Sequence, residues 1–245
     1  MRTLILFILF LLSFAGTASA DPTSEFSKGN EQFAAGKFQE AAETYEGIVR
    51  SGHWHADLFY NLGNARYRAG DIGRAILNYE RALAMEPKHP EAGANLRVAR
   101  DEARALELQQ GSWERYASRA TVSQYIWTAA MSFWAAIFLA AILYFRHRRS
   151  PVVTLLMASA VLLCATAIVA IYGHERGPNG RATAIVIDKN IQARVATADN
   201  ANTVLMLPPG SQVKVLSVRG DWTYAALPNN LSGWIPTASA ERLRL

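Results

Sequence analysis

Histidines give this sequence its most metal-like spacing. His53 and His55 are separated by one residue, and His89 is the next histidine along the chain. A zinc site needs three or four protein ligands held in one place. A pair plus one distant histidine does not supply them, so we interpret His53 and His55 as residues of a turn beside Trp54. The sequence predicts no metal and no cofactor.

Catalytic patterns are missing from the sequence as well. It has no glycine-rich phosphate loop, no cluster of cysteine with histidine, and no arrangement of serine, histidine and aspartate that suggests a nucleophile. The only cysteine, Cys164, lies inside an apolar run, which favours a packed small residue over a redox site. We therefore expect the protein not to be an enzyme.

Asparagine side chains suggest binding rather than catalysis. Asn30 and Asn64 are 34 residues apart, and so are Asn61 and Asn95. An amide both donates and accepts hydrogen bonds, so such residues can pair with the backbone of an extended peptide. The alternative is that these asparagines belong to the general pattern of a repeat. The predicted partner-binding residues are Phe26, Asn30, Tyr60, Asn61, Asn64, Tyr67 and Asn95.

The elements that carry these residues repeat along the chain. Four pairs share the 34-residue spacing: Gly29 and Gly63, Gly36 and Gly70, Ala41 and Ala75, Tyr45 and Tyr79. This period is typical of tetratricopeptide repeats, which are pairs of antiparallel helices. We predict about two and a half repeats over residues 21–110. Residues 98–110 are expected to form a connecting helix.

The resemblance to tetratricopeptide arrays implies a concave face that holds a peptide or a partner helix. The better-known version of that face grips a terminal carboxylate with lysine and arginine. Phe26, Glu91 and Asn95 stand at the matching positions, so the resemblance does not carry this carboxylate site over.

Two uncharged runs follow the repeats, at 125–145 and 152–173. Each supplies the roughly 20 apolar residues that a membrane-spanning helix needs. The loop between them, 146–151, carries Arg146, Arg148 and Arg149, and short basic loops stay in the cytoplasm. In the first span, Ser132, Ala136 and Ala140 form a stripe of small residues.

Residues 1–20 read as a signal peptide that ends in Ala18-Ser19-Ala20, with a retained anchor as the alternative. Both readings place the repeats outside the cytoplasm. Residues 111–124 connect the repeats to the first span, and 174–181 link the second span to the last module. Two returning spans therefore predict that both soluble modules face the periplasmic side.

The last module, 182–245, consists of short alternating runs separated by turn residues, which indicates an all-β domain. Its glycine, tryptophan and proline positions make it resemble the bacterial SH3 domain: Pro209-Gly210, Gly220-Asp221-Trp222 and Gly233-Trp234-Ile235-Pro236. Trp222, Tyr224 and Trp234 are candidates for an exposed recognition surface; the alternative is that they pack the barrel. The family's Gly-Pro is absent after Arg194.

The order of these parts resembles the E-type (BatE-like) membrane protein of bacterial aerotolerance operons. The fold class expected is therefore a multidomain membrane protein: a tetratricopeptide array, a two-helix transmembrane hairpin and a small SH3-like barrel. The resemblance implies a scaffold in the bacterial inner membrane, within an envelope stress-tolerance complex. The implied partners are proteins, among them von Willebrand-type membrane proteins of the same operon.

Two alternatives stay open. One is an assembly chaperone of the cytochrome c maturation type, although such proteins usually place their spans before the repeats. The other is a protein that binds peptidoglycan through its SH3 domain. Nucleic acid is not an expected partner, because the arginine loop between the two spans is too short to build such a site.

Overall fold

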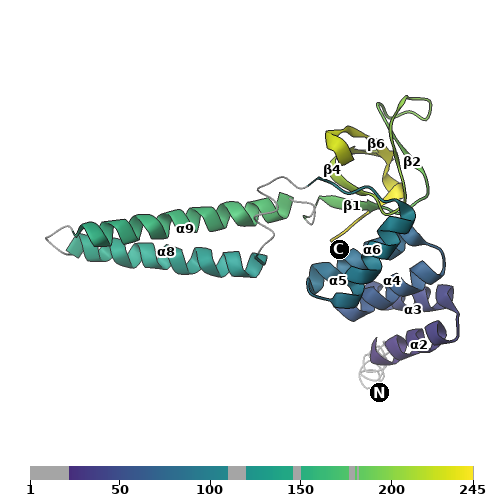
Figure 1. The fold of residues 1–245 in the computed structure, drawn as a ribbon, viewed down its shortest axis with the longest axis horizontal. Helices are drawn as coiled ribbons and strands as arrows, with labels where there is room; N and C mark the ends of the chain where they lie inside the picture. The colour runs from purple at the N-terminus through teal and green to yellow at the C-terminus, as the bar shows by residue number, and fades with distance from the viewer. Residues whose placement is uncertain (1–21, 110–119, 146–149, 177–179, 181, 245) are drawn as a thin grey trace, which may run out of the picture.

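The structure is a computed structural model that describes residues 22–109, 120–145, 150–176, 180 and 182–244. The expected signal peptide (1–20), most of the connecting segment and the loop arginines Arg146, Arg148 and Arg149 lie outside the described residues. Within the described part, a helical array, a long helical hairpin and an antiparallel β-sheet follow one another (Figure 1). We call the first the array (22–109), the second the hairpin and the third the β module (182–244).

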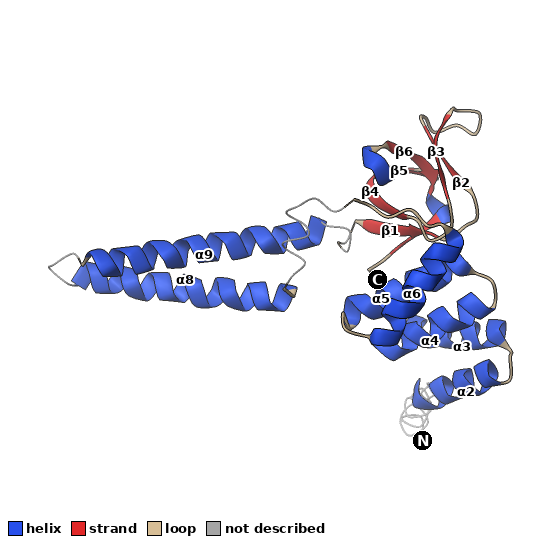
Figure 2. Cartoon of the chain, viewed as in Figure 1, coloured by secondary structure: helices blue, strands red, loops and turns tan. Residues whose placement is uncertain are grey.

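The array consists of helices of similar length stacked in antiparallel order (Figure 2). Gly36 and Gly70 end the first helix of each repeat with φ of +78° and +81°, a left-handed conformation that glycine adopts without strain. Asp71 then begins the next helix by accepting a hydrogen bond from the Arg74 N–H. The helices are α2 (Pro22–Ala34), α3 (Phe38–Arg50), α4 (Ala56–Arg68), α5 (Ile72–Met85) and α6 (Pro90–Ala103).

Each repeat is held together by a tyrosine ring that lies on a glycine of the facing helix. A Cβ atom added to Gly63 would lie 2.7 Å from the ring of Tyr79, and one added to Gly29 would overlap the ring of Tyr45. Both tyrosines are almost fully buried. The 34-residue spacing therefore repeats a physical contact, and it explains why glycine rather than alanine stands at these two positions.

Helix α6 ends earlier than the sequence suggests. The prediction of a connecting helix over 98–110 is wrong beyond Ala103, because Arg104 adopts a left-handed conformation with φ of 52°. The chain then runs toward the β module, where the Leu106 carbonyl accepts a hydrogen bond of 2.8 Å from the Gln212 N–H. The Leu106 N–H in turn donates to Ser211 Oγ at 3.1 Å.

The hairpin consists of α8 (Val122–Phe145) and α9 (Pro151–Arg176), two apolar helices that pack side by side. Both are long and apolar enough to cross a membrane. Ser132 is buried against α9, and Cys164 Sγ approaches the Ala129 carbonyl at 3.6 Å. In the predicted stripe of small residues, Ser132 is buried and Ala136 half-buried, but Ala140 is exposed. The last residue of the stripe is therefore not covered by α9.

The β module is one antiparallel sheet with strand order β3-β2-β6-β5-β4-β1-β7. Ala184 of β1 and Leu207 of β3 share a core although their strands lie far apart in that order, so the sheet wraps around its own side chains. Bulges between Ala193 and Arg194 and between Val215 and Ser217 assist this curvature. The strands are β1 (Thr183–Val186), β2 (Ile191–Arg194), β3 (Thr203–Leu207), β4 (Gln212–Arg219), β5 (Trp222–Ala226), β6 (Ser232–Pro236) and β7 (Ala240–Arg242).

The β module docks directly on α5 of the array. Ile76 and Ala75 share a buried cluster with Ile185. The backbone of Ile187 lies so close to Gly73 that a Cβ there would overlap it. The sequence offers no second helix for the third repeat, and the β module covers the apolar surface that remains on α5 and α6.

Polar contacts complete this interface. Glu80, which is 7% exposed, forms an ion pair with Arg100 and accepts a hydrogen bond of 2.9 Å from Gln212 Nε2. Burial raises the pKa of the Glu80 carboxyl, and the neighbouring Arg100 opposes that rise. Arg81 Nη2 lies 2.7 Å from Glu241 Oε1 and donates to the Arg242 carbonyl at 2.9 Å. The array and the β module are therefore joined by buried contacts.

Candidate partner-binding groove

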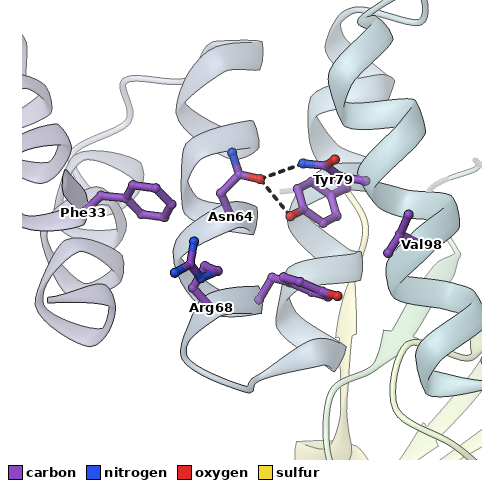
Figure 3. A pocket seen from close by; sticks show the side chains of 7 residues that line it. Phe33, Asn64, Arg68, Tyr79 and Val98 are labelled. Atoms are coloured by element: carbon purple, nitrogen blue, oxygen red, sulfur yellow. Dashed lines mark hydrogen bonds between the residues drawn. The ribbon is translucent and has the colours of Figure 1, made fainter. Parts of the chain in front are cut away.

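Asparagine side chains connect neighbouring repeats in two equivalent units. In the second unit, Asn64 Oδ1 accepts hydrogen bonds of 2.9 Å from both Tyr79 Oη and Asn95 Nδ2 (Figure 3). In the first unit, Asn30 Oδ1 accepts from Tyr45 Oη at 2.7 Å and from Asn61 Nδ2 at 3.2 Å. The asparagines predicted from sequence thus meet one another, and their first task is to hold the repeats in register.

These tyrosine hydroxyls are in an environment that keeps them protonated. Burial raises the pKa of Tyr45 to about 12, and it raises the pKa of Tyr79 further above its usual value. Each hydroxyl therefore remains a hydrogen-bond donor to its asparagine at physiological pH.

Phe26 and Tyr60 occupy equivalent positions of two successive repeats, and their rings pack between helices. The Phe26 ring lies 5.3 Å from the ring of His55, and the Tyr60 ring lies 4.9 Å from that of His89. Both histidines begin a helix, where Nδ1 accepts a backbone N–H: from Leu58 for His55 and from Ala92 for His89. Each histidine has a capping role at its helix. Among the described residues, no group of three or more side chains could hold a metal ion.

A cavity of about 220 Å³ opens beside the second asparagine unit, with lining residues from α2, α4, α5 and α6. Val98 is 56% exposed and Phe33 is half-buried, so both present apolar surface to an incoming ligand. Figure 3 shows Phe33 and Val98 on opposite sides of Asn64. The lining residues are Phe33, Asn64, Tyr67, Arg68, Tyr79, Asn95 and Val98.

Two amide atoms remain available at this cavity. Within the described chain, neither Asn64 Nδ2 nor Asn95 Oδ1 makes a hydrogen bond. The first is a donor and the second an acceptor, which is the pair of groups that a peptide backbone needs from a binding surface. Both side chains are partly exposed. Of these two amides, one donor and one acceptor therefore remain unused within the described chain.

Arg68 and Tyr67 of the cavity lining are both held by contacts outside it. The Arg68 guanidinium lies 4.5 Å from the centre of the Phe38 ring, which holds its side chain along the groove wall. Tyr67 Oη donates a hydrogen bond to Glu102, and this bond is the main reason that the pKa of Tyr67 is raised. Tyr67 thus presents its ring to the cavity while its hydroxyl is engaged.

Sequence reasoning missed Phe33 and Val98, although the repeat period contains the signal that finds them. Phe33 precedes Tyr67 by 34 residues, and Val98 follows Asn64 by the same interval. A residue that is equivalent to a groove residue lies in the groove of its own repeat. Phe33 and Val98 differ in chemical type from Tyr67 and Asn64, so an identity match at the repeat period does not find them.

The aromatic residues proposed for the β module lie together on the outer side of its sheet. The rings of Tyr224 and Trp234 are 5.0 Å apart, and the hydroxyl of Tyr224 is within 2.8 Å of Ser232 Oγ. Trp222, Tyr224 and Trp234 are all partly exposed. They form an aromatic surface on the β module.

Comparison with known proteins identifies the repeats. The tetratricopeptide repeat family matches residues 26–90 and 60–115. The chain therefore contains tetratricopeptide repeats, as the 34-residue period predicts. No curated protein matches the chain.

Several solved structures are similar to this chain. The complex of PcrH with the chaperone binding region of PopB is 17% identical, with 60% of this chain and 98% of that chain covered and a TM-score of 0.33. PcrH from Pseudomonas aeruginosa alone is 16% identical, with 62% and 96% covered and a TM-score of 0.34. A type III secretion (T3SS) complex from Aeromonas hydrophila is 19% identical, with 66% and 95% covered and a TM-score of 0.33.

Proposed function

We propose that this protein is a non-enzymatic, membrane-anchored adaptor that binds a partner protein through the groove of its array. The observation that supports it most directly is the cavity beside the second asparagine unit. There a free amide donor on Asn64 and a free amide acceptor on Asn95 lie beside the apolar surface of Phe33 and Val98. These groups suit the backbone and one apolar side chain of an extended segment.

Membrane anchoring is supported by the length and composition of α8 and α9. Because the array precedes the hairpin and the β module follows it, their direct contact requires both to lie on the same side of any membrane that the hairpin crosses. The basic residues between the spans favour the periplasmic side for both modules. In this view, the adaptor acts in an envelope stress-tolerance complex, with von Willebrand-type membrane proteins as its expected partners.

A photo-crosslinking amino acid at position 98 tests the binding face in intact membranes. We expect it to give a covalent adduct with a partner protein, identified by mass spectrometry, because the exposed Val98 side chain lies beside the cavity. The control places the same amino acid at Val195, which is similarly exposed, at 60%, on the β module. Adducts at position 195 alone, or retention of the protein on purified cell wall without any protein adduct at 98, would contradict the proposed function.

The partner found in this way then allows a quantitative test. Val98→Ser removes apolar area without disturbing the core, so affinity should fall on the order of fivefold to tenfold, which corresponds to about 1 kcal/mol of lost apolar burial. Val195→Ser is the matched control and should leave affinity and thermal stability unchanged. Equal affinities for the two variants would place the contact elsewhere.

A further inference from the structure

The repeat period arranges groove residues in rows that run across the first helices of the repeats. Asp57 and Glu91 form one row, since they are 34 residues apart, and Asn61 and Asn95 form the next. Seven residues separate Asp57 from Asn64 on α4, or about 10 Å at the rise of an α-helix. The asparagine amides therefore lie between a row of carboxylates on one side and the cavity of Phe33 and Val98 on the other.

The carboxylate row, which we call the acidic edge (Asp57 and Glu91), has no lysine or arginine partner in the described part of the chain. Their side chains are 76% and 61% exposed. Within the described chain, neither forms an ion pair with lysine or arginine. Two less exposed carboxylates of the array do have an arginine partner: Glu46 pairs with Arg66, and Glu80 pairs with Arg100.

A buried histidine lies beside the acidic edge. His89 lies between the two acids, with Nε2 at 3.5 Å from Asp57 Oδ1 and Nδ1 at 3.3 Å from Glu91 Oε2. Its side chain is only 6% exposed, and Nε2 has no hydrogen-bond partner. Nδ1 accepts the Ala92 N–H, so in the neutral ring the proton belongs on Nε2, which faces Asp57. In this neutral form, His89 does not compensate the negative charges of Asp57 and Glu91.

We propose that the segment bound in the groove is an extended peptide in which basic and apolar side chains alternate. The inference rests on the proposed function and specifies the chemistry of its partner. Successive side chains of an extended chain point to opposite sides. When the backbone lies on the Asn64 and Asn95 amides, one set of side chains reaches the acidic edge, and the other set enters the cavity beside Phe33, Tyr67 and Val98. Lysine or arginine matches the first, and aliphatic or aromatic residues match the second.

The test uses the full-length protein in nanodiscs of zwitterionic lipid, with empty nanodiscs measured in parallel. The probes are fluorescein-labelled octapeptides in which leucine alternates with lysine, serine or glutamate, and their binding is followed by fluorescence anisotropy. We expect the lysine–leucine peptide to bind more tightly than the serine–leucine peptide, and the glutamate–leucine peptide to bind least. The advantage of the lysine–leucine peptide should shrink as salt is raised, because exposed ion pairs are screened.

Variants assign this preference to the acidic edge. Asp57→Asn with Glu91→Gln should reduce affinity for the lysine–leucine peptide by about threefold to tenfold, the range of two partly exposed ion pairs, and should leave the serine–leucine peptide unaffected. The control, Glu40→Gln with Glu43→Gln, removes two exposed carboxylates from α3, outside the groove. It should change neither affinity.

The outcomes separate this inference from the proposed function. If the serine–leucine peptide binds and Val98→Ser weakens it, while lysine brings no gain, the groove binds peptides but the acidic edge does not select basic side chains. If the double variant at Asp57 and Glu91 behaves like its control, or no octapeptide binds, the inference is overturned. The proposed function is then still decided by the crosslink at position 98 to the native partner.

Discussion

At the scale of single residues, Asn64 combines a structural role, through its Oδ1 atom, with the proposed binding role of its Nδ2 atom. It accepts hydrogen bonds from Tyr79 and Asn95, so substitution of Asn64 by alanine would leave the buried Tyr79 hydroxyl unpaired. An unpaired buried donor costs roughly 1–3 kcal/mol. A loss of binding in such a variant would therefore not separate a groove contact from a weakened array. Val98, which is exposed, is the better probe of the groove.

The buried tyrosines predict an alkaline transition of the array. The pKa of Tyr45 is about 12 in the folded state, above its usual value of about 10, so between these pH values the unfolded chain releases the proton and the folded chain keeps it. Stability should be complete below about pH 10 and should fall as the pH rises toward 12. Thermal melts of the full-length protein in detergent, monitored by circular dichroism, measure this loss.

Tyr45→Phe is the informative variant in these melts. Without the hydroxyl the array should be less stable at pH 7 by about 1 kcal/mol, because the hydrogen bond to Asn30 is lost. Its melting temperature should then decline less steeply than that of the unmodified protein between pH 10 and pH 12. Identical slopes for the two proteins would mean that this tyrosine does not titrate with folding.

At the scale of elements, α5 is the helix on which the architecture depends. One side of it supplies Tyr79 to the asparagine unit, and another side supplies Ile76 and Glu80 to the contact with the β module. Helix α6 similarly carries Asn95 at the groove and Arg100 at the interface. The groove and the β module are therefore connected through the same two helices.

Gly73→Ala tests how tightly the β module is docked. In an isolated helix this change favours helix formation by up to about 1 kcal/mol. Here the added Cβ would overlap the backbone of Ile187, so we expect a net destabilisation of about 1–3 kcal/mol, measured as a lower melting temperature of the full-length protein. Gly47→Ala is the control, because the only atom near its Cβ is an arginine side-chain nitrogen 4.0 Å away. Gly47→Ala should be neutral or slightly stabilising; a Gly73→Ala variant that behaves the same way would show that the contact is loose.

At the scale of the whole molecule, the array and the β module contact each other although the hairpin separates them in sequence. The two chain segments that flank the hairpin meet at Leu106 and Gln212. A spanning hairpin with an even number of passes satisfies this contact, whereas one span would place the modules on opposite sides. The docking thus constrains membrane topology without any reference to charge.

Cysteine labelling tests this topology in a Cys164→Ala background. In spheroplasts, His53→Cys on the array and Asp188→Cys on the β module should both react with a membrane-impermeant maleimide, since both positions are exposed. His147→Cys, between the two spans, should react only after permeabilisation. Labelling of position 53 without 188 would refute the shared side, and labelling of 147 without either would reverse the orientation.

The sequence by itself determined the features that arise from local periodicity. The 34-residue spacing located the repeats, the uncharged runs located α8 and α9, and the alternation after residue 182 indicated strands, because each pattern reports which side of a single element is buried. The same spacing singled out Asn30, Asn61, Asn64 and Asn95, but not the pairs that meet, because Asn30 with Asn61 and Asn64 with Asn95 are not equivalent positions of the repeats.

Only the tertiary structure decided which side chains of different elements contact one another. Glu80 meets Gln212 across 132 positions of sequence, and Arg81 meets Glu241 across 160. No periodic pattern encodes such a contact, because its partners are individual side chains on different elements. The same reason explains the early end of α6. It also explains why Tyr79 and Asn95 donate to Asn64 Oδ1, which leaves one amide donor and one amide acceptor unused within the described chain.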